Sequence, residues 1–203
     1  MTIIAIKTGA GGEGTKVELS DGSSFLFKDC YLPAHVPVVA EGREIGGDEE
    51  AGFRFAAACL RAEKAALQLI ARAEQNSFGL GRKLEKRRHD PACVRAVIAR
   101  LVETGLLDNS RYCRLWLETK ISRQATSPWR LLAALRSRGI DRQDAQQALR
   151  DLLDDDGELQ LLRRYAEKLE RKRAKRAEPP PLRYLLKNEG FSSLAIQRFF
   201  EED

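Results

Sequence analysis

Aromatic residues, histidines and paired cysteines are scarce in this chain of 203 residues. Aromatics make up 7% of the sequence and charged residues 32%, a balance typical of a helical protein with much surface rather than of a domain with one large core. The only histidines are His35 and His89, and the four cysteines form no CxxC pair. The sequence therefore lacks both the ligand spacing of a zinc site and a Cys–His pair for nucleophilic catalysis.

The chain also lacks a long apolar run. No stretch approaches the roughly 18–20 apolar residues that would cross a membrane. Scattered thiols without a secretory signal favour a reducing compartment. We expect a cytoplasmic monomer with no membrane partner, no cofactor, no bound metal, no catalytic residue and no enzymatic activity.

A glycine-rich segment at residues 9–14 matches GxGxxG, but its surroundings argue against a nucleotide site. The dinucleotide fingerprint needs a helix that begins at the motif, whereas residues 15–20 alternate like a strand. Thr15-Lys16 also reverses the Lys-Ser/Thr order of a phosphate-binding loop. We interpret the segment as a flexible hairpin loop.

The first fifty residues have the pattern of a small sheet. Residues 2–7 are apolar and β-branched, and residues 15–20 and 23–28 alternate between apolar and polar side chains. Asp21-Gly22 separates the last two runs and is a strong hairpin signal. The pattern predicts three short strands in an antiparallel sheet.

The rest of the chain carries a block that recurs every 51 residues. Gly139 and Gly190 each follow a Leu-rich helical stretch, where we expect a left-handed residue to end the helix, and Arg88 occupies the corresponding position one period earlier. The apolar positions keep the same register: Leu80/Leu131/Leu182, Leu84/Leu135/Leu186, Val94/Ala145/Ile196 and Val97/Ala148/Phe199. A fixed period with matched apolar positions predicts stacked repeats, because each repeat needs its neighbour to bury its apolar face.

Capping residues and breaks divide each repeat into three helices. Asp90-Pro91 and Ser127-Pro128, for example, have the form of an N-cap followed by a first-turn proline. We predict a mainly α fold of three tandem three-helix repeats in a curved array, preceded by the small sheet. The predicted segments are 1–50 for the β-rich part and 51–107, 108–155 and 156–203 for the repeats.

Charge is distributed unevenly along the chain. Residues 1–52 hold 4 Lys/Arg and 9 Asp/Glu, whereas the remainder holds 31 and 21. A basic array favours a polyanion or an acidic protein surface, although a solvated helical face has the same composition. The candidate contacts for DNA or a nucleoprotein filament are Arg82, Lys83, Lys86, Arg87, Arg88, Arg130, Arg136, Arg138, Arg163, Arg164, Lys168 and Arg171.

Two further features have alternative interpretations. The acidic run at residues 154–156, followed by Glu158, could bind a cation, but we interpret it as the start of a helix whose free amides it satisfies. Trp116 and Trp129 could stack on nucleobases, but we interpret them as core anchors.

Residues 56–203 resemble the RecX family, regulators of the RecA recombinase. The most specific stretch is 84–113, which ends in ETGLLDNSRYC, where the family typically reads Leu…Gly-Tyr-Leu-Asp-Asp-x-x-Phe-Ala. Residues 135–140 match the family's Leu…Lys-Gly-Ile/Val element. The chain departs from the pattern at Asn109, Cys113 and the pair Arg88-His89, and these changes mark a divergent member.

The resemblance implies a function that composition alone does not. RecX-like proteins consist of three tandem three-helix modules, bind in the groove of the RecA–single-stranded DNA filament, and suppress its ATPase, its strand exchange and its growth. It implies a role in DNA repair, homologous recombination and the SOS response, with the RecA filament as partner and weak binding to single-stranded DNA alone. The alternative is a helix-turn-helix transcriptional regulator, since three-helix units also build that motif.

Overall fold

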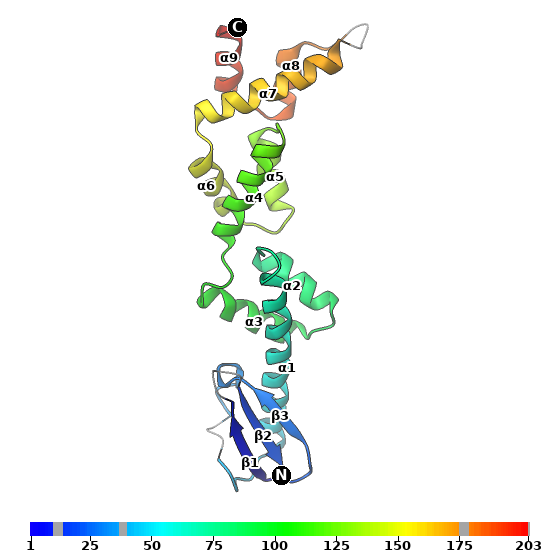
Figure 1. The fold of residues 1–203 in the computed structure, drawn as a ribbon, viewed down its shortest axis with the longest axis vertical. Helices are drawn as coiled ribbons and strands as arrows, with labels where there is room; N and C mark the ends of the chain where they lie inside the picture. Colours follow the sequence, from blue (N-terminus) through cyan, green and yellow to red (C-terminus); the bar gives the residue numbers. More distant parts are fainter. Residues whose placement is uncertain (10–13, 37–39, 175–178, 203) are drawn as a thin grey trace. The chain divides into compact units, whose positions relative to one another are not determined.

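The computed structural model of the protein describes residues 1–9, 14–36, 40–174 and 179–202. The chain divides into two compact units, Met1–Leu107 and Asp108–Asp203. Within the described residues, a three-stranded sheet is followed by nine α-helices (Figure 1). This confirms the predicted mainly helical fold with a small N-terminal antiparallel sheet. The finer division of the chain into four segments stays a prediction.

The sheet has the strand order β1-β2-β3, with both neighbouring pairs antiparallel. Its strands are β1 (Ile3–Thr8), β2 (Thr15–Leu19) and β3 (Ser24–Phe27). The predicted hairpin turn is confirmed, because Gly22 has a φ of 86° and the Ser23 amide donates to Asp21 Oδ1 at 3.0 Å. The interpretation of the glycine-rich segment as a loop depends on residues 10–13, which lie outside the described residues.

The first unit buries one face of the sheet against a long helix. The Phe27 ring in β3 stacks on the Phe53 ring with centroids 5.3 Å apart, and both residues are fully buried. Figure 1 shows α1 running from the sheet to the two shorter helices of this unit. The helical elements are a 3-10 turn (Asp29–Tyr31), α1 (Gly47–Ile70), α2 (Ser77–Lys86) and α3 (Pro91–Glu103).

In the described residues of the second unit, six helices surround two apolar clusters. One cluster contains Leu131 and Leu135, the other contains Leu162 and Leu186, and both have Ile121 packed against them. The helices are α4 (Asn109–Arg123), α5 (Pro128–Arg136), α6 (Arg142–Leu152), α7 (Asp155–Arg173), α8 (Leu182–Glu189) and α9 (Ser193–Glu201).

The N-caps recur with the predicted period. The carboxylates of Asp90 and Asp141 each accept a backbone amide hydrogen bond of 2.7 Å in the first turn of α3 and α6. Ser192 is the next equivalent residue, and its hydroxyl accepts from the Ala195 amide at 3.1 Å at the start of α9. Each side chain satisfies an amide that has no partner within its helix.

The helix breaks recur in the same register. Arg88, Gly139 and Gly190 have φ values of 64°, 77° and 96°, so all three lie in the left-handed region. After each of them, the next amide donates to the carbonyl five residues earlier, as in His89 to Leu84 at 3.2 Å and Ile140 to Leu135 at 3.2 Å. This is the Schellman termination, which confirms the left-handed conformation predicted for the two glycines. Arg88 adopts it without the freedom of glycine.

Candidate nucleic-acid interface

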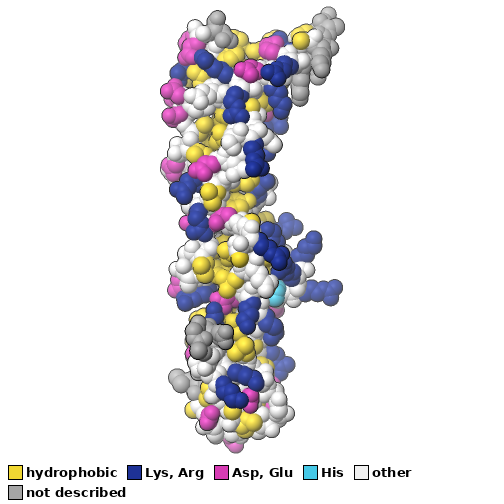
Figure 2. Space-filling view, viewed as in Figure 1, with side chains coloured by type: hydrophobic (Ala, Val, Ile, Leu, Met, Phe, Trp, Pro, Cys, Tyr) yellow, Lys and Arg dark blue, Asp and Glu magenta, His cyan; other side chains and the backbone are white. Residues whose placement is uncertain are grey.

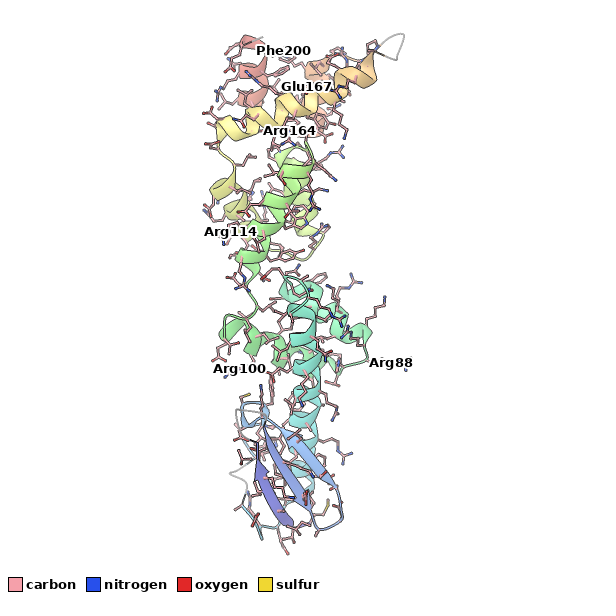
Figure 3. All side chains as sticks on the ribbon, viewed as in Figure 1. Arg88, Arg100, Arg114, Arg164, Glu167 and Phe200 are labelled. Atoms are coloured by element: carbon pink, nitrogen blue, oxygen red, sulfur yellow. The ribbon has the colours of Figure 1, made fainter. Side chains whose placement is uncertain are left out.

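The strongest concentration of predicted contact residues lies on α2 and the turn after it. Leu80 and Leu84 are fully buried, so helical periodicity places the intervening cations on the opposite, exposed face. Figure 2 shows Lys and Arg side chains projecting over this helix, and Figure 3 marks Arg88 just beyond its end. The exposed cations of this group, the α2 basic cluster, are Arg82, Lys83, Lys86, Arg87 and Arg88.

Some cations of the α2 basic cluster contact another side chain of the protein and are occupied in this sense, whereas others have no such partner. Lys83 Nζ donates to Gln75 Oε1 at 2.6 Å, and the Arg82 guanidinium lies 5.8 Å from the centroid of the Phe78 ring. Within the part of the chain that the structure describes, the side chains of Lys86, Arg87 and Arg88 form neither a hydrogen bond nor an ion pair. Their charge is therefore free to meet an anion.

The corresponding cations of the second unit are mostly occupied. Arg130 Nε lies 2.6 Å from Oε1 of Glu189, a carboxylate that is 7% exposed. Arg138 donates to the Ala134 carbonyl at 2.7 Å, and its guanidinium lies 4.6 Å from the centroid of the Trp116 ring. Arg136 is exposed and has no partner among the described residues. One of the three predicted contacts on this segment is thus unoccupied.

Glu189 organises a small polar site between α5, α7 and α8. The fully buried Ser127 donates its hydroxyl proton to the Glu189 backbone carbonyl at 2.6 Å. Burial, and after it the hydrogen bond to the Glu189 carboxylate, raises the pKa of Tyr165 to about 12. Arg130 therefore balances a buried charge, and its first role is structural. Sequence reasoning missed Glu189 because no local pattern marks it.

Two of the predicted cations on α7 contact other residues of the protein, and two do not. Arg164 donates to the carbonyls of Ile121 and Ser122 at 3.1 and 3.3 Å, where it caps the end of α4. Arg163 forms an ion pair with Glu202. Lys168 and Arg171 are exposed and unpartnered in the described ranges. Lys175 and Arg176, which follow in the sequence, lie outside the described residues.

The two tryptophans differ from the prediction that both anchor the core. Trp116 is half-buried beneath Arg138, but Trp129 is 63% exposed. The reason is helical periodicity, since residue 129 lies about 140° around the helix from the middle of the buried stripe that runs through Leu131 and Leu135. The interpretation of Trp129 as a core residue was therefore wrong.

The acidic run at the beginning of α7 acts as a helix start, as predicted. Asp154 Oδ1 accepts from the Gly157 amide at 2.7 Å. Asp156 pairs with Arg198 at 2.9 Å, and Glu158 accepts from the Ser192 amide at 2.7 Å. Over the described ranges, no group of three or more His, Cys, Asp or Glu is placed to hold a metal, and no helix is long and apolar enough to cross a bilayer.

Comparison with known proteins assigns the chain to a family. A family model described as "RecX, second three-helix domain" matches residues 108–149. "Regulatory protein RecX" of Treponema pallidum (strain Nichols) is 34% identical over 152 residues, which cover 74% of this chain and 91% of that protein. The chain belongs to the RecX family. Regulatory protein RecX of Pseudomonas savastanoi pv. phaseolicola is 42% identical over 91 residues, 43% of this chain and 56% of that relative.

Solved RecX structures have the same fold. A crystal structure of regulatory protein RecX matches 98% of both chains with a TM-score of 0.77 at 19% identity. A crystal structure of RecX from Lactobacillus salivarius matches 71% of this chain and 96% of its own with a TM-score of 0.63 at 20% identity. The structures show the three-helix domains of the family, and the 34% identity to regulatory protein RecX makes this protein a RecX-type regulator.

Proposed function

We propose that this RecX protein is a non-enzymatic, cytoplasmic regulator that binds the RecA–single-stranded DNA filament and inhibits its ATPase, strand exchange and growth. Membership of the RecX family supports the choice of partner. The observation that carries the proposal is the presence of three cations on one exposed turn, Lys86, Arg87 and Arg88, which are unpartnered among the described residues. A nucleoprotein filament presents a long row of negative charge to which such a turn can bind.

Cations in more than one repeat raise the affinity for the filament. Each phosphate that a Lys or Arg neutralises releases counterions, so binding depends steeply on salt. Exposed cations without a partner in the described ranges also occur in the second unit, at Arg136, Lys168 and Arg171. Two basic units in one chain act at high effective concentration once either has bound, so several weak contacts can occupy a filament together. Inhibition then needs less than one regulator per recombinase subunit.

The test is the rate of ATP hydrolysis by preformed RecA filaments on single-stranded DNA, titrated with the full chain. We expect inhibition that weakens as salt rises, and no hydrolysis of ATP by the regulator alone. No inhibition at equimolar amounts would reject the proposal. Tight, sequence-selective binding to duplex DNA without any effect on RecA would instead favour the transcriptional regulator.

A charge-reversal variant makes the titration specific. Arg82→Glu, Lys86→Glu and Arg87→Glu together should weaken inhibition, because they remove exposed cations of the α2 basic cluster. The matched control is Arg114→Glu, Arg123→Glu and Arg142→Glu, which changes the net charge equally at exposed positions of the second unit that have no partner among the described residues. Equal loss of inhibition in both variants would show that total charge, not the α2 basic cluster, determines binding.

A further inference from the structure

Two exposed aromatic side chains occupy the same position of successive repeats. Phe78 and Trp129 are 51 residues apart, and each is the second residue of its helix, α2 and α5 respectively. Phe78 is 48% exposed and Trp129 is 63% exposed. Large aromatic side chains are normally buried, so the recurrence of exposure at one repeat position calls for a partner.

The local structure holds both rings outward. Each aromatic follows a capping side chain by two residues, since the first-turn amides of α2 and α5 donate to Asn76 and Ser127. Leu80 and Leu131 each lie two residues after the aromatic and are buried. Because two residues are about 200° apart around a helix, the aromatic lies on the opposite side, away from the core. The two platforms are therefore built by the same local geometry.

Gly190 adds a second support beneath Trp129. A Cβ atom on Gly190 would lie 2.5 Å from Trp129 Cβ, so only glycine lets the two segments approach this closely. The base of the indole side chain is thus held against the end of α8 while the residue as a whole stays exposed. Packing at the base of the side chain restricts the rotamers of Trp129, which lowers the conformational entropy that the residue loses when it binds a partner.

Both rings lie on helices that carry an exposed cation without a partner among the described residues. Neither α2 nor α5 has an acidic residue in its first turn. Arg82 lies over the Phe78 ring. Arg130 follows Trp129 directly but is paired with Glu189, so the cation of α5 without a partner among the described residues is Arg136, which lies about two helical turns after Trp129 on the same face. The remaining cations of the α2 basic cluster lie on the same helix as Phe78 or just after it. Each ring thus presents a flat apolar face beside positive charge.

The ligand that offers both a flat aromatic face and a negative backbone is a single strand of nucleic acid. Its unpaired bases can stack on aromatic side chains while its phosphates meet cations, whereas the bases of a duplex are already stacked on each other. We propose that Phe78 and Trp129 are stacking platforms for unpaired bases of single-stranded DNA. This inference rests on the proposed function and deepens it by naming the residues that contact DNA bases. The third repeat has Pro180 at the equivalent position, so it lacks the platform.

Fluorescence of Trp129 provides a direct test without RecA. The chain has two tryptophans, so the full-length Trp116→Phe variant reports on Trp129 alone. It is titrated at low salt with an oligo-dT and with an abasic oligomer of the same length and charge. We expect quenching and tighter binding with the oligo-dT. Equal quenching and equal affinity for the two oligomers, or no binding of either, would overturn the inference.

Substitutions test each platform in the otherwise native chain. Trp129→Ala and Phe78→Ala should each lower oligo-dT affinity about tenfold, the scale of one lost base stack. Trp129→Phe and Phe78→Tyr should retain most of the affinity. The control is Leu194→Ala, which removes a 51% exposed apolar side chain on α9 and should leave binding unchanged. Urea midpoints equal to that of the parent protein would show that the alanine variants remain folded.

The RecA assay separates this inference from the proposed function. If the alanine variants bind oligo-dT normally, stacking is rejected even where the parent protein inhibits RecA. If they bind oligo-dT normally but inhibit RecA poorly, the rings contact the recombinase itself, and stacking is again rejected. A parent protein that binds oligo-dT through both rings but never inhibits RecA would reject the proposed function and leave stacking in place.

Discussion

The segments around α2 in the first unit and α5 in the second unit occupy equivalent positions of the repeat, yet they use their cations differently. At the end of α2, the side chains of Lys86, Arg87 and Arg88 are exposed and unpartnered among the described residues. Around α5, Arg130 is paired with the buried Glu189, and Arg138 packs on Trp116. The comparison teaches that the number of Lys and Arg residues on a helix does not measure the charge available to a partner.

The turns that end α2 and α5 also differ in the residue that adopts the left-handed conformation. Gly139 adopts a positive φ without strain in the second unit, whereas the first unit places Arg88 there at a φ of 64°. A left-handed arginine costs about 1–2 kcal/mol relative to glycine. The first unit thus carries a strained but exposed cation where the second has only backbone.

The largest expected effect tests whether the stability of the second unit depends on Gly190, the left-handed residue at the end of α8. Gly190→Val should lower the free energy of unfolding by about 3 kcal/mol or more, because it combines a positive φ with a Cβ clash against Trp129. Urea unfolding followed by tryptophan fluorescence measures it, since both tryptophans lie in the second unit. An unchanged midpoint would mean that the turn rearranges freely.

The next effect tests whether the α2 basic cluster supplies the positive charge that binds the filament. The combined change Arg82→Glu, Lys86→Glu and Arg87→Glu should lower the affinity for filaments on the order of 100-fold at low salt and reduce the salt dependence by about three charges. Fluorescence anisotropy with labelled filaments over a range of salt concentrations measures both. The matched reversal of Arg114, Arg123 and Arg142 serves as the control. An affinity that does not respond would place the contact elsewhere on the protein.

A smaller effect should distinguish a structural arginine from a free one. Arg130→Ala should lower the free energy of unfolding by about 1–2 kcal/mol, because it leaves the buried Glu189 carboxylate without a countercharge. Arg87→Ala should change it by less than about 0.5 kcal/mol while it weakens filament binding. Urea unfolding and anisotropy on both variants measure the two effects. Equal changes in stability and in filament binding for the two variants would contradict the distinction between a structural Arg130 and a free Arg87.

The smallest expected effect concerns the strained turn of the first unit. Arg88→Gly should raise the free energy of unfolding by about 0.5 kcal/mol, because relief of the left-handed strain exceeds the added chain entropy. It should also weaken filament binding slightly through the loss of one cation. Circular dichroism of urea unfolding reports the stability. Destabilisation would show that the Arg88 side chain has a packing role.

Local signals in the sequence predicted much of the fold. The Asp-Gly hairpin, the caps at Asp90 and Ser127 and the left-handed Gly139 are all confirmed. Each depends on atoms within a turn of one another, so the residues involved are close in the chain. The apolar register is confirmed for the same reason, because a buried stripe follows from helical periodicity.

The candidate site was less predictable, because pairing and exposure depend on distant segments. Arg163 meets Glu202 across 39 residues of chain, and Arg164 meets the Ile121 carbonyl across 43. No nearby residue signals either contact. The exposure of Trp129 could have been inferred, since its position falls off the Leu131 and Leu135 stripe and repeats at Phe78.

The sequence by itself determined the helices, their caps, their left-handed ends and the 51-residue register, because these depend on short-range sterics and hydrogen bonds. The tertiary structure alone decided which cations are free. A guanidinium that reaches a buried carboxylate or an orphan carbonyl is occupied, whereas an identical one on an exposed turn remains available to a phosphate. That difference separates Arg130 and Arg164 from Arg87, although all three belong to similar basic runs.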